Sequence, residues 1–336
     1  MRTRRRGSLS ARTERVAQRR LGVRSAVATI GVAALLLAGP AGAADIFEKV
    51  GTFDGQFLKI NVGARAEGMG GAFVGVADDA TALYWNAAGI ARIDPDKSEF
   101  SFNQAVWPGD LQFTQAGYVF HLKRFPGAFG FSVRALYMDP MIETTAFQPN
   151  GTGNTFDAGY MTAGLTYARS FTDKFSAGGT IHFIHEGLAE FSQQTYAVDV
   201  GSLYDVGALG MRIGMAISNI GSQITFIDRA GRIPPMFRVG TSLNLLQRGD
   251  QKLIGSFEFS HPPDNAERMN VGAEYSFQKF AFLRGGYNLN YDAEGMAAGA
   301  GFHIPVSVAG QADVDYSYTD MKDLGGAHRF SIRFQF

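Results

Sequence analysis

The sequence of 336 residues contains no cysteine and little proline, with 11 Pro against 42 Gly. Without cysteine the chain forms no disulfide and carries no lipid on an N-terminal cysteine. The scarcity of proline separates this glycine excess from the composition of a low-complexity, disordered chain. Residues 44–336 also lack any run of about 18 apolar residues, so we expect no membrane-spanning helix in that part of the chain.

Basic residues are concentrated at the N-terminus, where nine Arg lie in residues 1–24 beside a single acid, Glu14. The apolar run AVATIGVAALLLA and the motif Ala41-x-Ala43 follow. This order predicts a signal peptide over residues 1–43, cleaved near Ala43, because 13 apolar residues are too few for a retained helical anchor. Of 31 basic and 31 acidic residues, 22 and 30 then remain, and this net charge of about −8 excludes a basic footprint for nucleic acid.

From Ser98 onward the chain shows segments in which apolar and polar residues alternate, the pattern of β-strands. In one of them Phe129, Phe131 and Val133 share a face opposite Gly130 and Ser132. We predict fourteen strands, over residues 98–106, 112–122, 127–138, 159–170, 175–185, 194–204, 211–218, 236–244, 252–259, 267–277, 280–287, 295–303, 306–318 and 328–336.

A soluble sandwich and a membrane barrel both contain alternating strands, and strand length favours the barrel. Most of the predicted strands have eight to thirteen residues, whereas sandwich strands usually have about five or six. Connections after even strands are mostly short and those after odd strands mostly long, as in outer-membrane barrels. The sequence therefore predicts an all-β fold, a 14-stranded antiparallel transmembrane β-barrel over residues 98–336, in contact with outer-membrane lipid.

Residues 44–97 precede the strands and contain a glycine-rich, helix-compatible stretch, GARAEGMGGAFVGVADDATALYWNAAGIAR. We predict a short helix over 80–85, capped by Asp78 or Asp79 and ending near Asn86 and Gly89. A barrel of this size has a lumen that wall side chains alone do not fill. Residues 44–97 are therefore expected to form a plug, or hatch, inside the lumen.

The same stretch resembles the N-terminal signature of PorV/PorQ-type outer-membrane proteins, relatives of the FadL long-chain fatty-acid transporter. The resemblance to this family continues through LTYARSFTDKFSAGGTIHFIHEGLAE and AFLRGGYNLNYDAEG, so it covers essentially the whole mature chain. The family commonly has Asn-Pro-Ala-Gly where this chain has Asn86-Ala87-Ala88-Gly89, which loosens that turn. The resemblance implies a bacterial outer-membrane location, and Phe334 and Phe336 on the last strand resemble the signal that the outer-membrane assembly machinery recognises.

Two functions fit this resemblance. The first, which the closer likeness favours, is a PorV-like component of protein secretion or surface attachment that binds exported proteins. The second is a FadL-like transporter of hydrophobic small molecules such as fatty acids, which requires an apolar pocket; Phe47, Phe53, Phe57 and Leu83 are further candidates to line it. The residues expected in the hatch or at its ligand are Gly68, Met69, Gly70, Phe73, Asp78, Asp79, Tyr84, Trp85, Asn86 and Gly89.

No enzymatic motif emerges, and we predict neither catalysis nor a cofactor. The glycines at 68, 70 and 71 do not form a dinucleotide-binding motif, because Phe73 stands where the last glycine would be. His182 and His185 lie three residues apart on one strand and face opposite sides, so no shared metal site is expected.

The predicted polar strand faces carry charges of both signs, which can pair across the lumen or with the hatch. Pairing is favoured because an unpaired charge in a filled lumen is costly, and an ion-selective channel would need an excess of one sign. The predicted luminal charges are Arg134, Asp199, Arg212, Arg238, Glu258, Glu274, Asp313, Asp315, Arg329 and Arg333.

Overall fold

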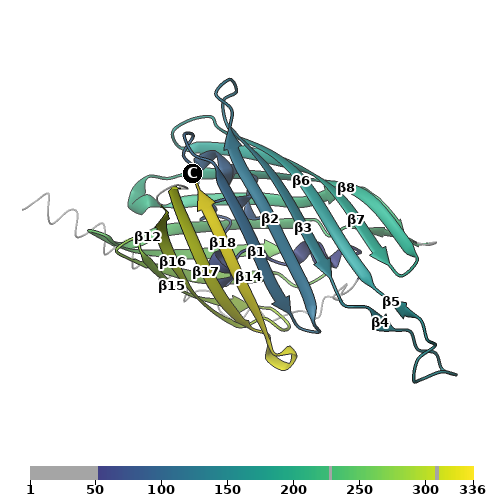
Figure 1. Ribbon diagram of the computed structural model, residues 1–336. Coiled ribbons are helices and arrows are strands. Elements are labelled where there is room, and N and C mark those ends of the chain that lie inside the picture. The colour runs from purple at the N-terminus through teal and green to yellow at the C-terminus, as the bar shows by residue number, and fades with distance from the viewer. Residues whose placement is uncertain (1–51, 227–228, 307–309) are drawn as a thin grey trace, which may run out of the picture. The chain divides into compact units, whose positions relative to one another are not determined.

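The computed structural model describes residues 52–226, 229–306 and 310–336. Within these ranges the chain forms a closed antiparallel barrel of fourteen strands, which confirms the predicted fold class (Figure 1). Each strand pairs with its sequence neighbours in the barrel, and β1 closes the ring against β18, with Phe100 opposite Phe334. The barrel strands are β1 (Glu99–Trp107), β2 (Leu111–His121), β3 (Ala128–Tyr137), β6 (Ala158–Ser170), β7 (Phe175–Leu188), β8 (Phe191–Asp205), β9 (Arg212–Gly221), β12 (Met236–Arg248), β13 (Gln251–His261), β14 (Arg268–Phe277), β15 (Ala281–Leu289), β16 (Met296–Val306), β17 (Gly310–Asp320) and β18 (Gly326–Gln335).

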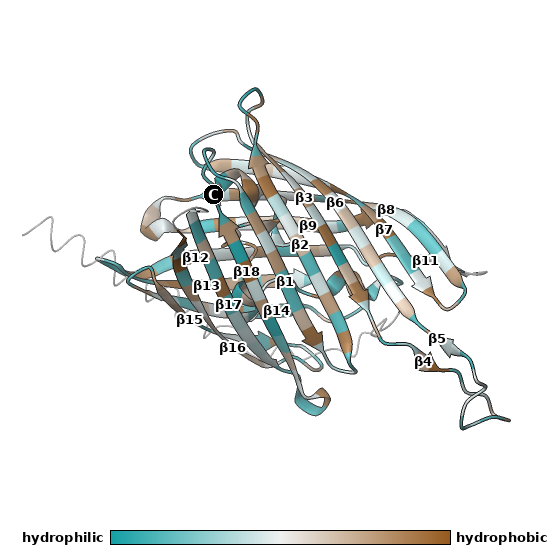
Figure 2. Ribbon diagram, viewed as in Figure 1, coloured by the Kyte–Doolittle hydropathy of each residue, from teal (hydrophilic) through white to brown (hydrophobic). Residues whose placement is uncertain are grey.

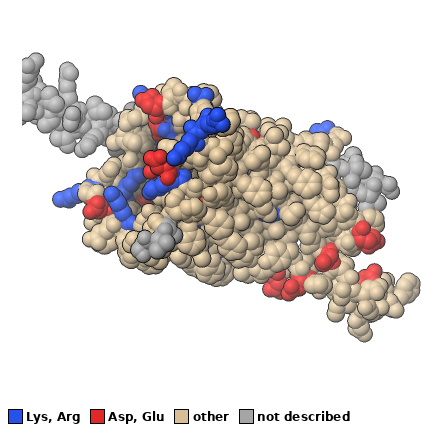
Figure 3. Space-filling view, turned by 45° about the horizontal axis from the view of Figure 1, so that its top comes forward, with Lys and Arg blue, Asp and Glu red and all other residues tan. Residues whose placement is uncertain are grey.

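Along the strands, buried polar side chains alternate with exposed apolar ones. Figure 2 shows the matching alternation of hydrophilic and hydrophobic colours along β1 to β3. On β18, Phe330 and Ile332 are 53% and 39% exposed, whereas Arg329 and Ser331 between them are 2% and 7% exposed. Figure 3 shows the charged residues toward the ends of the molecule, with a wide uncharged area between them. An apolar outer surface of this extent is typical of a barrel that lies in lipid.

The two ends of the barrel differ in their connections. One end, here called the turn end, contains Ser98, Phe336 and short connections such as 171–174 and 249–250. The opposite end, the loop end, contains the long connections 138–157 and 222–235. Each of these includes a two-stranded ribbon that the alternation pattern did not predict; the ribbons consist of β4 (Met141–Ile142) with β5 (Thr155–Phe156), and β10 (Gln223–Phe226) with β11 (Arg229–Arg232).

The length predicted for the connection after residue 185 is wrong. It was expected to be long, but β7 and β8 pair in register as far as Leu188 and Phe191, which leaves a two-residue turn. Glu186 and Gln193 are polar and were therefore assigned to the connection. Both belong to the strands, where they continue the inward-facing, polar half of the alternation.

Residues 52–97 are called the inner segment, and most of them lie inside the barrel. Most of the side chains between Leu58 and Ile90 are buried, and the short helices pack against β3, β6 to β8 and β15 to β18 (Figure 1). Residues 1–51, which include the predicted signal peptide and Phe47, lie outside the described residues. The helices of the inner segment are η1 (Gln56–Lys59), α2 (Ala64–Gly68), α3 (Ala82–Trp85) and η2 (Ala87–Arg92); two further turns, η3 (Ala208–Gly210) and η4 (Lys322–Leu324), connect barrel strands.

Candidate functional site

Trp85 is the centre of the inner segment's own core. Its side chain is 1% exposed, and its Nε1 donates a hydrogen bond to the carbonyl oxygen of Val62 at 2.8 Å. The rings of Phe73 and Tyr84 pack against it, with centroids 5.9 and 5.2 Å away. Met69, Phe73 and Leu83 are 0–2% exposed. These large side chains therefore hold the segment together and do not line an open ligand pocket.

Glycines allow the inner segment to touch the barrel wall. Gly70 and Gly71 have φ angles of 65° and 72°, which follow α2 with a left-handed turn. The backbone of Gly70 lies against Gly286 on β15, and a Cβ atom on Gly286 would overlap the Gly70 backbone. Gly68 lies against Gly299 on β16 in the same way. Backbone therefore packs on backbone along this side of the lumen.

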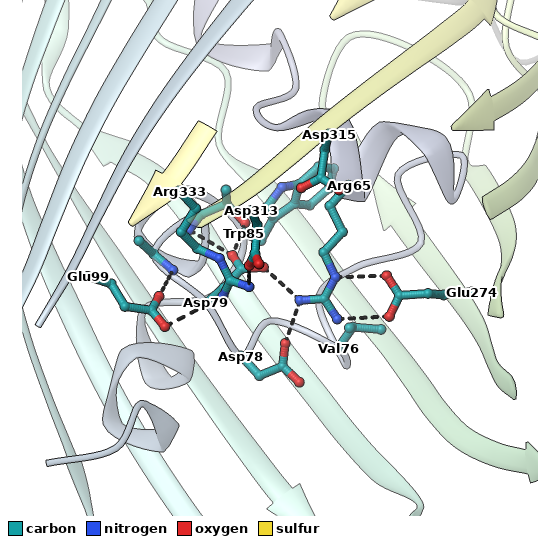
Figure 4. Close-up of polar contacts among 12 residues, drawn as sticks. Arg65, Val76, Asp78, Asp79, Trp85, Glu99, Glu274, Asp313, Asp315 and Arg333 are labelled. Carbon is teal, nitrogen blue, oxygen red and sulfur yellow. Dashed lines mark hydrogen bonds and ion pairs between the residues drawn. The ribbon is translucent and has the colours of Figure 1, made fainter. Parts of the chain in front are cut away.

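Arg65 on α2 joins three carboxylates (Figure 4). Its Nη1 lies 2.8 Å from Asp78 Oδ1 and 2.7 Å from Asp79 Oδ2, and its Nε lies 2.9 Å from Glu274 Oε2 on β14. Glu274 in turn binds Arg284 at 2.7 Å. The guanidinium therefore connects two parts of the inner segment to the barrel wall.

Asp78 and Asp79 do not cap the short helix, so that prediction is wrong. The helix begins at Ala82, and its N-cap Thr81 makes no side-chain capping bond. Asp79 accepts hydrogen bonds from the Thr81 amide and hydroxyl, and Asp78 pairs with Arg212 on β9 at 3.2 Å as well as with Arg65. Burial opposes ionisation of both carboxyls, but the neighbouring arginine charges, Arg65 first among them, and hydrogen bonds outweigh it and hold each pKa below its ordinary value.

Asn86 and Gly89 do follow the helix, in different roles. Asn86 is the C-cap of α3 and the N-cap of η2, where its side chain accepts a hydrogen bond from the Ala88 amide. Its Nδ2 donates to the carbonyl oxygens of Val74 and, on β8, Ser202. Gly89 lies within η2, and a Cβ there would overlap the Ala77 carbonyl. A tight turn therefore forms here without a proline.

Wall carboxylates also bind backbone amides of the inner segment. Glu258 on β13 accepts hydrogen bonds from Phe73 N at 2.9 Å and Val74 N at 2.8 Å. Glu99 on β1 accepts one from Ala80 N at 2.9 Å. These bonds satisfy buried amides that lack a partner in a regular helix or strand.

Tyr84 is held between two wall cations. The guanidinium carbons of Arg134 and Arg238 lie 5.2 and 5.1 Å from its ring centroid. Arg238 Nη2 donates to the Tyr84 hydroxyl at 3.0 Å, and Arg238 also lies 3.6 Å from Glu258. Cation–π contacts therefore contribute to the fit of inner segment and wall.

The remaining predicted luminal charges also face inward and find partners. Asp199 binds His182 and the Asn219 amide, and Arg329 binds Glu67 of α2 at 3.0 Å. Asp313 on β17 forms an ion pair with Arg333 on β18, and Asp315 forms one with Arg284. The lumen thus contains a network of alternating charges. Its members that were not among the predicted residues include Arg65, Glu67, Glu99 and Arg284.

A cavity lies at the loop end, between η1 and the wall strands β2, β3 and β6 to β8. It has a volume of about 480 Å³ and is lined mainly by apolar groups, including Phe53, Phe57, Leu136 and Tyr160. The rings of Phe57 and Tyr160 stack with their centroids 5.0 Å apart. Of the apolar residues predicted to line a pocket, Phe53 and Phe57 do so, whereas Leu83 does not.

Phe334 and Phe336 lie on the outer face at the turn end, 36% and 54% exposed. The Phe336 ring stacks near Tyr118, with centroids 6.4 Å apart. Their suggested part in assembly stays a prediction.

Within the described ranges, no helix is both long and apolar enough to cross a membrane, and no group of three or more acidic, histidine or cysteine side chains is placed to hold a metal ion.

Residues 32–181 match the sequence model of a family described as "Uncharacterised protein family (UPF0164)". A comparison with curated proteins finds no match.

Solved structures share the barrel. The Ralstonia pickettii toluene transporter TbuX is 14% identical, with a TM-score of 0.57 over 81% of this chain and 97% of that one. The CymD monoaromatic hydrocarbon channel is 12% identical, with a TM-score of 0.55 over 82% and 96%. A Pseudomonas aeruginosa FadL homologue is 12% identical, with a TM-score of 0.55 over 82% and 98%. At these identities the likeness shows a shared fold: the chain is a closed 14-stranded barrel like those of FadL-type outer-membrane channels.

Proposed function

We propose that this chain is an outer-membrane barrel that admits small hydrophobic molecules, which first bind in the cavity at the loop end. The observation that carries the proposal is the cavity itself, about 480 Å³ in volume and walled mainly by aromatic and aliphatic groups. Ligand pockets typically have volumes of about 300–1,000 Å³ and mostly apolar walls. Long loops face outward in outer-membrane barrels, so a cavity at this end is open to molecules from outside the cell.

The solved barrels of the same fold support this function over the secretion-associated one. They are named as a toluene transporter and a monoaromatic hydrocarbon channel, and a cavity for small apolar molecules fits that class of protein. The PorV-like part in protein secretion stays a prediction from the resemblance.

Passage from the cavity to the turn end requires movement of the inner segment. The side chains between the cavity and the turn end, such as Phe73, Trp85 and Ile90, are 0–1% exposed. We therefore expect ligand binding near η1 to be coupled to a shift of the segment, because the side chains of its core are packed and buried.

Filling the cavity tests the proposal. Ala158 on β6 points inward and lines the cavity, whereas Leu165 on the same strand is 62% exposed on the outer face. Cells lacking the protein receive wild type, Ala158→Trp or Leu165→Trp at matched surface levels, and uptake of radiolabelled naphthalene is measured. We expect Ala158→Trp to reduce the initial rate to that of cells without the protein, and Leu165→Trp to retain the wild-type rate. Equal rates for all three proteins would refute the proposed entry site.

A further inference from the structure

We propose that the loop-end cavity selects hydrophobic amines, binding the protonated amino group through Glu186 and Gln193 and the apolar part against Phe57 and Tyr160. This inference rests on the proposed function and names the substrate class of the same cavity.

Two polar atoms of the cavity are buried acceptors that lack a donor. Glu186 is 5% exposed and its Oε2 accepts a hydrogen bond from Gln193 Nε2. Glu186 Oε1 and Gln193 Oε1 are buried without a hydrogen-bond partner among the described residues, and both residues line the cavity. Buried acceptors are nearly always paired, so a ligand that brings N–H groups fits this site. An ammonium group supplies three donors and no acceptor.

Charge in the cavity has one sign. Asp54 and Glu186 are the ionisable carboxylic acids of the lining, and the described lining contains no Lys, Arg or His. A fatty-acid carboxylate would therefore meet two acidic groups and find no cation to pair with. A protonated amine is attracted by the same two acidic groups.

Aromatic walls suit a cation as well as an apolar skeleton. Phe53, Phe57, Tyr137 and Tyr160 all line the cavity. The negative face of an aromatic ring attracts an ammonium group, and rings combined with carboxylates form a recurring environment for such cations.

Three of the connections around the cavity are acidic too, whereas the connection 222–235, whose Arg232 carbonyl accepts a hydrogen bond from the Asp54 amide, carries Arg229 and Arg232. Residues 108–110, 138–157 and 189–190 contain no Lys, Arg or His. Figure 3 shows acidic side chains without basic neighbours at its lower right, where β4 and β5 project. Such a surface raises the local concentration of cations at the mouth. The acids of these connections are Asp110, Asp139, Glu143, Asp157 and Glu190.

The test compares three ligands with one carbon skeleton: 4-phenylbutylamine, butylbenzene and 4-phenylbutanoate. Binding is measured by equilibrium dialysis against the full-length protein in nanodiscs of zwitterionic lipid at pH 7, with empty nanodiscs subtracted. We expect the amine to bind at least about tenfold more tightly than either other ligand, the effect of one charge-assisted hydrogen bond.

Glu186→Gln removes the negative charge and keeps the local structure, because a glutamine can still accept the hydrogen bond from Gln193. We expect this variant to lose the preference for the amine while its affinity for butylbenzene stays unchanged. Asp250→Asn, at an exposed turn at the opposite end of the barrel, is the control and retains the preference.

Three outcomes would overturn the inference. Equal or tighter binding of butylbenzene or 4-phenylbutanoate would show that the cavity takes neutral or anionic molecules, and the proposed function would stand. An unchanged preference in Glu186→Gln would show that the carboxylate does not select the ligand. If none of the three ligands binds, the cavity is not an entry site and the proposed function fails with the inference.

Discussion

Replacing Arg65 by methionine removes the cation that joins the inner segment to the wall while keeping a side chain of similar length. Arg65 lies within 3 Å of Asp78, Asp79 and Glu274, and its side chain is only 15% exposed. Removing one partner of a buried ion pair costs about 3–5 kcal/mol. Asp78 and Glu274 keep other arginine partners, whereas Asp79 keeps only hydrogen bonds to Thr81. We therefore expect the low end, about 3 kcal/mol.

Amide hydrogen exchange read by mass spectrometry measures this loss locally. A cost of about 3 kcal/mol predicts that amides of residues 64–86 exchange at least about a hundredfold faster when they open locally, with little change in the barrel strands. Arg248→Met, at an exposed position at the end of β12, is the control and leaves exchange unchanged. Wild-type exchange rates in Arg65→Met would show that packing around Trp85, and not the ion pairs, holds the inner segment.

Other predictions concern the wall, a loop and the last strand. Gly286→Ala should push Gly70 off the wall and raise exchange in the inner segment, whereas Gly285→Ala, with open space at its Cβ, should not. Burial raises the pKa of Glu294 to about 7, above its ordinary 4.5, so its contribution to stability is full below about pH 4.5 and is lost as the pH rises through 7. Glu294→Gln should therefore slow exchange in residues 290–295 at pH 8 relative to wild type and change little at pH 5. Deleting Phe336 should reduce the fraction of assembled barrel, read as the heat-modifiable band on a gel, whereas an unchanged fraction would remove its part in assembly.

The barrel could be predicted because one physical rule, alternation of polar and apolar side chains, runs through every long strand. The rule fails where strands are short: β4 and β5 have two residues each, too few to show a period. It also misplaced the end of β7, because Glu186 was assigned to a polar connection when it is an inward residue of the strand.

The site could be predicted only in part, because partners in the lumen come from distant parts of the chain. Wall charges such as Glu258 and Arg329 follow from their strand faces. Arg65 has no such pattern, and its role depends on where α2 lies inside the barrel. The lining of the cavity depends on which apolar side chains are not buried in the core. Trp85 is buried in the core, whereas Phe57 lines the cavity.

The most direct test of the central claim is gentle extraction of the protein from its membrane, followed by mass spectrometry of the molecules that co-purify. We expect apolar small molecules, amines among them, to co-purify with the wild type and with Leu165→Trp, and to be lost with Ala158→Trp. Recovery of exported proteins in place of small molecules, unchanged by Ala158→Trp, would contradict the account and support the secretion-associated function.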